Sequence, residues 1–219
     1  MLKDVVSAEE GLAFERALFD SDGLRIGFWT AKEHGLVCPQ AYESRAGFEN
    51  AKLQSKLRGW PVSLRPTGGG TVPQGPSFEN VVVAFVPRDD ATITSVYKDF
   101  TEALSTGLGS NDLEPGDTPG SFCDGTWNLS FNGQKVVGTA QRWRPRTSKA
   151  PRVIAHALIV TRSDFRSGAE EVARFHKDLG LSDIVPDAHT SLEETLGLSR
   201  LPTAEITAAL RAKFGQDQI

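Results

Sequence analysis

The chain has 219 residues, 39% of them hydrophobic and 24% charged, so it holds enough apolar side chains for a packed core. Its formal net charge of -4 argues against a general nucleic-acid-binding protein, because such proteins usually carry a basic face. No segment approaches the ~20 consecutive apolar residues that a membrane-spanning helix needs, and we therefore expect no membrane partner.

The N-terminal part alternates between helical and extended patterns. Residues 8–19 have apolar side chains at helical spacing behind Ser7, with Glu10 three positions later as in a capping box. Residues 24–30 alternate and are β-prone, so we predict that they form the first strand. Residues 40–58 are polar with apolar side chains spaced for a second amphipathic helix, which would end at the following glycine.

The middle of the chain is richer in extended patterns. Residues 62–65 predict a short strand that leads into a loop rich in glycine and proline. Residues 80–87 are mostly apolar and β-branched, which is typical of a buried strand stopped by proline. A helix is predicted over residues 92–108, followed by a long acidic loop over residues 109–121.

A β-hairpin is the clearest local prediction. Residues 126–131 and 134–139 would pair around Asn132-Gly133, because Asn-Gly suits the positive backbone angles of a type I′ turn. Residues 152–161 predict a further strand, and the last sixty residues are mostly helical. Strands and helices interleave without a regular βαβ rhythm, which favours an α+β fold with helices packed against a sheet.

Three consecutive glycines, Gly68, Gly69 and Gly70, stand out because each adds to the backbone entropy lost on folding. Without Cβ atoms, this backbone lets a ligand lie directly against it, and its N–H groups can face an anion or a carbonyl oxygen. A plain flexible turn is the alternative. The triplet fits neither a Walker-type phosphate loop nor a dinucleotide-binding fingerprint.

Lys135 follows the Asn-Gly turn after one residue. A lysine in a hairpin is commonly a solvated edge residue, but the small residues Gly138, Thr139 and Ala140 leave space for its stem beside a cleft. In that position its ammonium would be a point charge suited to a developing oxyanion or a phosphoryl oxygen. We therefore treat Lys135 as the candidate catalytic residue.

Cys123 is a possible nucleophile. The only other cysteine is Cys38, and we expect both thiols to be free in a reducing cytoplasm, since the N-terminus has no apolar run of signal length. A reactive thiol needs a nearby cation that lowers its pKa, which Lys135 across the hairpin could supply. An inert buried thiol is the alternative.

Arginines and histidines complete the set of candidates. Four arginines could form an anion-binding rim or simply be solvated at the surface; they are Arg65, Arg142, Arg144 and Arg146. His156 lies in a predicted strand among apolar residues, where a core histidine bonded to a carbonyl is the plain interpretation. The other histidines have no ligand-like spacing, so we expect no metal site; they are His34, His176 and His189.

Two blocks of sequence resemble a known family. Residues 65–72, RPTGGGTV, are similar to an Arg-Arg-x-Ser-Gly-Gly-Gly-Ala-Val signature, and residues 132–142, NGQKVVGTAQR, to a Gly-(Arg/Lys)-Lys-x-x-Gly-Ser-Ala-(Gln/Tyr)-Arg block. Weaker similarities lie at Gln40, at His156 and at residues 191–194. Together they resemble the catalytic domain shared by lipoate–protein ligase A, lipoyl or octanoyl transferases and, more distantly, biotin–protein ligases.

The resemblance implies a fold and a reaction. The fold would be a mixed, largely antiparallel sheet flanked by helices, in a single catalytic domain over residues 1–219 without a C-terminal accessory domain. The reaction would join a lipoyl or octanoyl group, as adenylate or thioester, to a lysine of an acceptor lipoyl domain, with ATP and magnesium as possible cofactors. Lys135 would be catalytic, and the implied substrate-binding residues are Arg65, Thr67, Gly68, Gly69, Gly70, Gly138, Thr139, Ala140 and His156.

Departures from the family pattern leave three interpretations open. The family's Asn-Asp-Leu before the hairpin is Trp127-Asn128-Leu129 here, so a carboxylate that could help to hold magnesium is missing. The first interpretation is a ligase that works through an acyl-adenylate, either alone or with a separate activation subunit. The second is a transferase that uses a Cys123 thioester without ATP, and the third is an inactive lipoate-binding relative.

Overall fold

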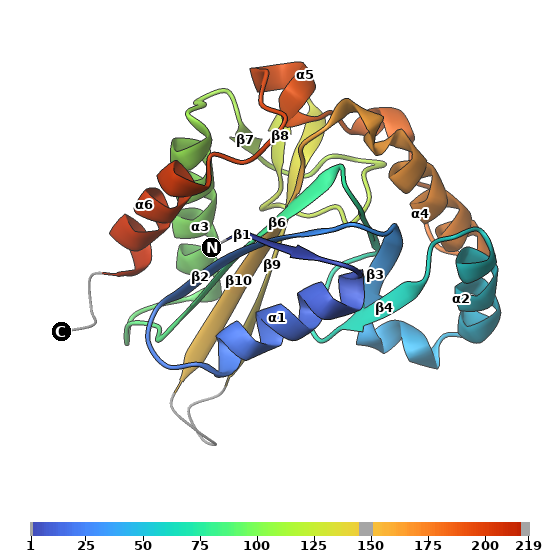
Figure 1. Ribbon diagram of the computed structural model, residues 1–219, viewed down its shortest axis with the longest axis horizontal. Coiled ribbons are helices and arrows are strands. Elements are labelled where there is room, and N and C mark those ends of the chain that lie inside the picture. The colour runs from blue at the N-terminus through green and yellow to red at the C-terminus, as the bar shows by residue number, and fades with distance from the viewer. Residues whose placement is uncertain (1, 145–150, 216–219) are drawn as a thin grey trace.

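The main sheet of this protein is mixed and largely antiparallel. The structure is a computed structural model that describes residues 2–144 and 151–215. Seven strands lie side by side in the order β1-β2-β6-β10-β9-β8-β7 (Figure 1). Their bounds are β1 Leu2–Val5, β2 Arg25–Ala31, β6 Phe78–Phe85, β7 Glu114–Pro115, β8 Leu129–Phe131, β9 Gln134–Arg144 and β10 Arg152–Val160. Among the described strands of this sheet, β1 and β2 pair in parallel and the other neighbours are antiparallel, so the α+β fold class is confirmed.

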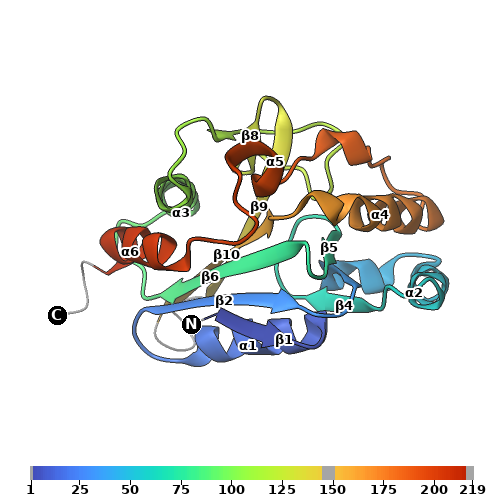
Figure 2. The same cartoon turned by 45° about the horizontal axis from the view of Figure 1, so that its top comes forward.

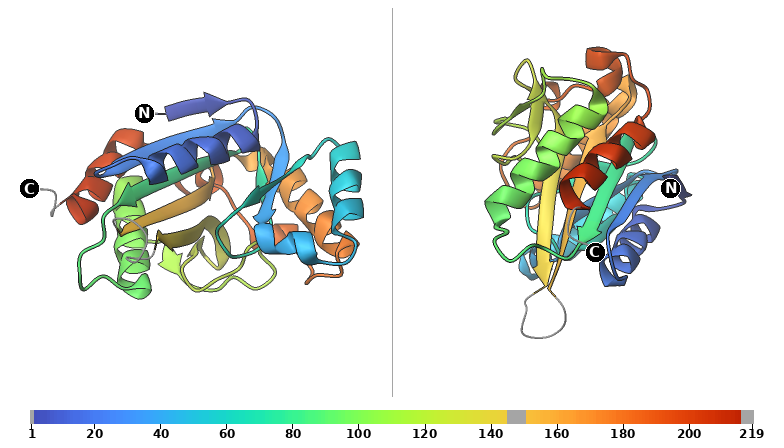
Figure 3. Two further views of the ribbon diagram at one scale, coloured as in Figure 1. Left: turned by 90° about the horizontal axis from the view of Figure 1, so that it is seen from below. Right: turned by 90° about the vertical axis from the view of Figure 1, so that its left-hand side faces the viewer.

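Helices cover both faces of this sheet. All eight residues of β6 are buried, because successive side chains point to opposite faces and both faces are covered. Val81 and Val83 pack in the cluster under α3 (Ile93–Leu108) and α6 (Thr203–Phe214), whereas Val82 and Ala84 pack under α1 (Ala8–Asp20). Figure 3 shows α3 and α6 on one side of the sheet and α1 on the other.

A second, three-stranded sheet positions the glycine loop. Its order is β4-β3-β5, with β3 over Gly35–Pro39, β4 over Val62–Arg65 and β5 over Val72–Gln74. The three glycines connect β4 to β5. The helices α2 (Phe48–Leu57) and α4 (Arg166–Asp178) flank this sheet and lie side by side (Figure 2).

An ion pair joins this region to α4. The Arg58 guanidinium contacts the buried Glu171 carboxylate at 2.8 Å just after α2 ends. The remaining helix, α5, spans Leu192–Leu196 and starts at Ser191 with a capping box to Glu194. It follows the long connection from α4 and lies beyond the end of β10.

Most of the predicted elements are present with shifted ends. The hairpin is confirmed, and Asn132 and Gly133 both have positive φ, of 50° and 78°, as a type I′ turn requires. Ser7 caps α1 by accepting from the Glu10 N–H at 3.4 Å, but the Glu10 carboxylate bonds the N–H of Val6 and not that of Ser7. The predicted capping box is therefore only half formed.

Several boundaries were predicted wrongly. Residues 24–30 are not the first strand, because β1 precedes them. The helix predicted over residues 40–58 is divided into a 3-10 helix at Gln40–Ser44 and α2, because Gly47 adopts a left-handed φ of 83° between them. The short strands β5 and β7 lie where loops were expected. No helix in the described ranges has the length and apolarity to cross a bilayer.

Candidate functional site

The glycine loop packs against the backbone around Cys123. The Gly70 N–H donates to the Cys123 sulfur at 3.1 Å. A Cβ atom on Gly70 would lie 3.1 Å from the Cys123 Cα, and one on Gly69 would lie 2.7 Å from its Sγ. The loop is therefore not a plain flexible turn, since a side chain at Gly69 or Gly70 would force its neighbours at Cys123 to shift.

Replacement of Gly69 by alanine should displace the Cys123 sulfur. Gly69 has a φ of 97° as well as no room for a methyl group, so the substitution is strained twice. We expect iodoacetamide to alkylate Cys123 about tenfold more slowly in this variant. The reason is that the sulfur moves away from the groups that lower its pKa. Gly68→Ala is the matched control, since nothing lies within 4 Å of its added methyl. Equal alkylation rates in both variants would contradict this account.

Lys135 points into the protein and holds the Cys123 segment. Its side chain is fully buried, and its Nζ donates to the carbonyl oxygens of Phe122 at 2.5 Å and Cys123 at 2.7 Å. A Cβ on Gly138 would lie 3.3 Å from that Nζ, so the glycine clears the space the ammonium occupies. Burial lowers the Lys135 pKa to about 8, against the raising effect of negative charge at Cys123 and Asp124. Its catalytic role stays a prediction.

Asn128 and His189 hold the same segment from two other directions. The Asn128 side chain donates to the Cys123 carbonyl at 3.1 Å and accepts from the Thr139 N–H at 3.2 Å. His189 accepts from the Phe122 N–H at 2.9 Å, and burial lowers its pKa to about 4, which keeps the ring neutral at pH 7. With Lys135, three buried side chains fix the backbone on which the thiol stands.

The Cys123 thiol lies in an electropositive setting. The residue adopts a φ of 50°, which non-glycine residues rarely do and which occurs often at functional sites. Burial alone would raise its pKa, but the Arg65 and Lys135 cations and the Gly70 N–H outweigh burial, and the pKa is lowered. Cys38 is also free, and burial raises its pKa to about 12. Of the two thiols, Cys123 is therefore the one whose surroundings favour the thiolate, and its role as nucleophile stays a prediction.

Arg65 is buried, so the surface-solvated alternative is excluded for it, whereas its role in binding an anion or a substrate stays a prediction. Its guanidinium donates to the carbonyl oxygens of Val37, Gly68 and Gly70 at 3.2, 3.1 and 2.6 Å. The same Nη2 lies 3.7 Å from the Cys123 sulfur. Main-chain carbonyls carry only partial charge, so they do not neutralise the positive charge of Arg65. That charge therefore lowers the pKa of the Cys123 thiol.

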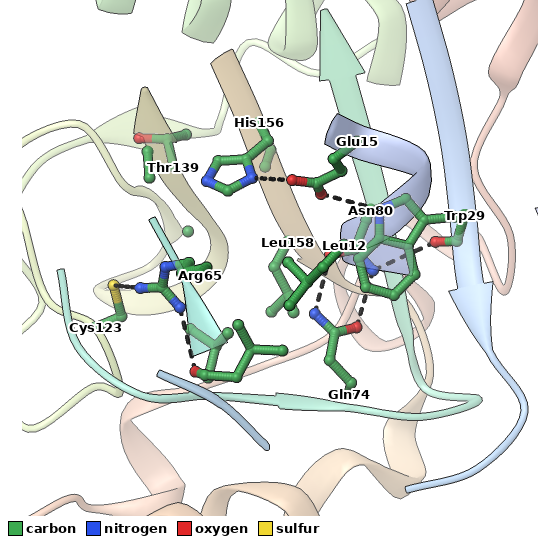
Figure 4. Close-up of a pocket in the computed structure, with 15 residues that line it drawn as sticks. Leu12, Glu15, Trp29, Arg65, Gln74, Asn80, Cys123, Thr139, His156 and Leu158 are labelled. Atoms are coloured by element: carbon green, nitrogen blue, oxygen red, sulfur yellow. Dashed lines mark hydrogen bonds and ion pairs between the residues drawn. The ribbon is translucent and has the colours of Figure 1, made fainter. Parts of the chain in front are cut away.

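An inner cavity opens beside Cys123 between the two sheets. Its walls include Leu12, Trp29, Val37, Val72 and Leu158, and it reaches Gly138, Thr139 and Ala140 on β9 (Figure 4). Polar side chains at its far end bond one another. Gln74 and Asn80 exchange two hydrogen bonds, at 3.1 and 2.9 Å. Because these groups are already paired, the cavity can accept an apolar group without leaving them unsatisfied.

His156 separates this inner cavity from a second one. Its Nδ1 lies 2.8 Å from the Glu15 carboxylate and its Nε2 3.3 Å from the Thr67 hydroxyl, so its partner is not the carbonyl that we expected. The second space, which we call the rim cavity, is also lined by Arg16 and Arg142. The two cavities share Leu12, Glu15, Arg65 and His156.

The other candidate residues lie apart from Cys123. Arg142 is exposed at the rim cavity, as expected of a rim residue, whereas Arg144 pairs with Asp20. Arg146 lies outside the described residues. His34 packs against Trp60 with the two ring planes tilted by 37°, and His176 bonds the Ser182 carbonyl at 3.0 Å. No group of three or more metal-ligating side chains gathers within residues 2–144 and 151–215.

Four side chains that line the inner cavity were missed in the sequence, namely Glu15, Trp29, Gln74 and Asn80. Glu15 shares a helical face with Leu12 and Phe19, at positions i, i+3 and i+7, so a carboxylate on the apolar face of a predicted helix was a readable signal. Trp29 donates its indole N–H to Glu15 at 2.9 Å. The Gln74–Asn80 pair had no local signal, because it forms only when β5 and β6 come together.

Comparisons with known proteins identify the family and the fold. Residues 47–215 match the family model described as the lipoyl protein ligase A/B catalytic domain. An uncharacterised protein of Cupriavidus necator is 30% identical, over 96% of this chain and 93% of its own length. An octanoyl-[GcvH]:protein N-octanoyltransferase of Kyrpidia tusciae is 31% identical over 63% of this chain, and that match spans half of the relative's length. A crystal structure of lipoate-protein ligase A bound with ATP superimposes with a TM-score of 0.68 at 17% identity, covering 99% of this chain and 82% of the other, which confirms the fold.

Proposed function

The chain belongs to the lipoyl protein ligase A/B catalytic domain family, and from that premise we propose that it takes part in protein lipoylation by passing an octanoyl or lipoyl group through a thioester on Cys123. It is an enzyme of the lipoate ligase and octanoyltransferase kind. The relative from Kyrpidia tusciae bears the name of an N-octanoyltransferase that takes its acyl group from GcvH. A protein lysine is accordingly the acceptor that we propose.

One observation carries the thioester proposal. The Cys123 sulfur accepts from the Gly70 N–H, lies 3.7 Å from the Arg65 guanidinium and borders the inner cavity. A thiolate held by a cation and an amide at the mouth of an apolar cavity is arranged for nucleophilic attack on an acyl group. Of the two enzymatic interpretations, we therefore favour the cysteine-dependent transferase.

Asn128 supports the same choice. In the family pattern this position carries a carboxylate that could help to hold magnesium. Here both ends of the Asn128 amide bond the protein's own backbone, at Cys123 and Thr139. An uncharged amide used in this way is a weak ligand for magnesium, which prefers carboxylates and phosphates. The residue serves the cysteine segment instead.

The proposed reaction has two balanced steps. The Cys123 thiolate attacks the acyl carbon of the donor, the C–S bond forms, the donor's bond to that carbon breaks, and its leaving amine takes up a proton. The neutral amine of the acceptor lysine then attacks the thioester. The C–N bond forms, the C–S bond breaks, the thiolate returns and the amine gives up one proton. No net proton is consumed when one lysine amide is exchanged for another.

The acyl chain would extend from Cys123 past His156. The inner cavity measures about 40 Å³, which is room for about three water-sized groups, fewer than the eight carbons of an octanoyl group. The rim cavity measures about 380 Å³ and shares the wall at Leu12, Glu15 and His156. The paired polar groups of that wall are satisfied, so an alkyl chain can lie along them.

Intact-mass measurement tests the proposal. We expect the protein to gain the mass of one octanoyl group from octanoyl-GcvH or from p-nitrophenyl octanoate without ATP, and to lose it to an apo lipoyl domain. Hydroxylamine should also remove the group, because thioesters react with it readily. Transfer that requires free octanoate, ATP and magnesium and passes through no acyl-protein would favour the adenylate interpretation. Lipoate binding without any transfer would favour the inactive relative.

A further inference from the structure

Cys123 also borders a third space, which is lined mostly by other residues than the inner cavity. This outer cavity measures about 260 Å³ and is lined by Gly68 and Gly69, by Asp124 next to the nucleophile, and by the side chains of Tyr97, Trp127 and Gln141. The inner and outer cavities meet at Cys123, Thr139 and Ala140. Among the residues that the structure describes, the outer cavity has no counterpart to the aliphatic side chains of Leu12, Val37, Val72 and Leu158 that line the inner cavity.

Two aromatic rings form one wall of the outer cavity. The rings of Tyr97, from α3, and Trp127, from the segment before β8, stack with centroids 5.7 Å apart and planes 4° apart. Neither ring belongs to the hydrophobic clusters formed by the described residues. The Thr139 hydroxyl donates to the Trp127 carbonyl at 2.7 Å, which fixes that segment beside the sulfur. A rigid aromatic pair that is only partly buried therefore lies next to the nucleophile.

The carboxylate of Asp124 also lines the outer cavity, and it is held in place by hydrogen bonds. The Asp124 Oδ1 accepts from the N–H groups of Thr118 at 2.6 Å and Gly125 at 2.9 Å, while the residue itself is exposed. Burial raises the pKa of Tyr97, and negative charge at Cys123 adds to this, so the phenol stays neutral. Neutral aromatic faces and a carboxylate are the combination that binds an alkylammonium group in proteins.

We infer that the outer cavity is the binding site for the acceptor's lysine side chain, with the Tyr97–Trp127 pair and Asp124 holding its ammonium and stem before attack. This rests on the proposed function, and it adds the residues that recognise the amine. The inner side of the sulfur would be filled by the acyl chain, which leaves the outer side for the nucleophile. Arg65 and Lys135 lie further in, and two cations there favour the neutral amine that must attack.

The inference is tested by a Trp127→Leu variant that is acylated with p-nitrophenyl octanoate and then offered two amines. Nα-acetyl-lysine methylamide is cationic at pH 7, whereas hydroxylamine is neutral. We expect acyl-protein formation and hydroxylamine cleavage at wild-type rates, with KM for the lysine amide raised about tenfold, the scale of a lost cation–π contact. Trp127→Phe should restore much of the affinity. Tetramethylammonium should compete with the lysine amide in the wild type only.

The outcomes separate this inference from the function on which it rests. Phe131→Leu is the control, since Phe131 is a partly buried aromatic residue of the same hairpin that does not line the outer cavity. If Trp127→Leu raises KM for both amines alike, or for neither, the inference is overturned although the thioester forms. If the wild-type protein forms no acyl-protein at all, the proposed function is overturned and this inference with it.

Discussion

A Cys123→Ala protein is expected to lose acyl transfer by about 10⁴-fold or more, because a covalent route disappears when its nucleophile is removed. The sulfur touches Gly70 and Arg65 and borders both the inner and the outer cavities. An alanine keeps the shape of the segment, because Lys135 and Asn128 bond only its carbonyl oxygen. The loss should therefore be chemical, with the melting temperature close to that of the wild type.

Cys38→Ala is the matched control for this prediction. Cys38 is also a free thiol, but it is fully buried in β3 and its raised pKa keeps it protonated. We expect this variant to transfer at the wild-type rate and to form the acyl-protein normally. If Cys123→Ala transfers at a rate near that of the wild type, a Cys123 thioester intermediate is excluded. The acyl-adenylate interpretation would then be favoured. Rates are best measured as acceptor mass gained per unit time with octanoyl-GcvH as donor.

The hairpin that carries Lys135 and the glycine loop could be predicted from the sequence, because each depends on neighbouring residues in the chain. Asn132-Gly133 demands a type I′ turn, and that turn places Lys135 on the strand that borders Cys123. The glycine triplet indicates that another group lies close to the loop backbone, but it does not indicate which group. We expected its N–H groups to face an anion or a carbonyl oxygen, and in this structure the Gly70 N–H donates to the Cys123 sulfur.

The partners of these pieces could not be predicted in the same way. The Glu15–His156 contact joins residues 141 positions apart, and periodicity reports a residue's face but not its neighbour across the sheet. The burial of Arg65 could not be predicted for a related reason. An arginine is usually solvated, and only the arrangement of three carbonyl oxygens around it reveals that it is buried as a cation for the thiol.

Replacement of Lys135 by methionine should lower acyl transfer by about 10²–10³-fold, the scale found when one prearranged electrostatic group is removed from an active site. Methionine fills similar volume but leaves the Phe122 and Cys123 carbonyl oxygens without their donor. It also removes a cation that lowers the Cys123 pKa. We therefore expect a weaker thiolate on a less rigid segment, and a lower melting temperature.

The pH dependence of this variant provides the decisive measurement. In the wild type, the rate of acyl-protein formation should rise as Cys123 ionises and fall above about pH 8, where Lys135 loses its charge. In Lys135→Met the descending limb should vanish, and the ascending limb should move to higher pH, because the thiolate has lost a stabilising cation. Iodoacetamide alkylation followed against pH reports the Cys123 ionisation directly. An alkylation midpoint equal to that of the wild type, with transfer undiminished, would show that Lys135 neither charges the thiol nor positions it.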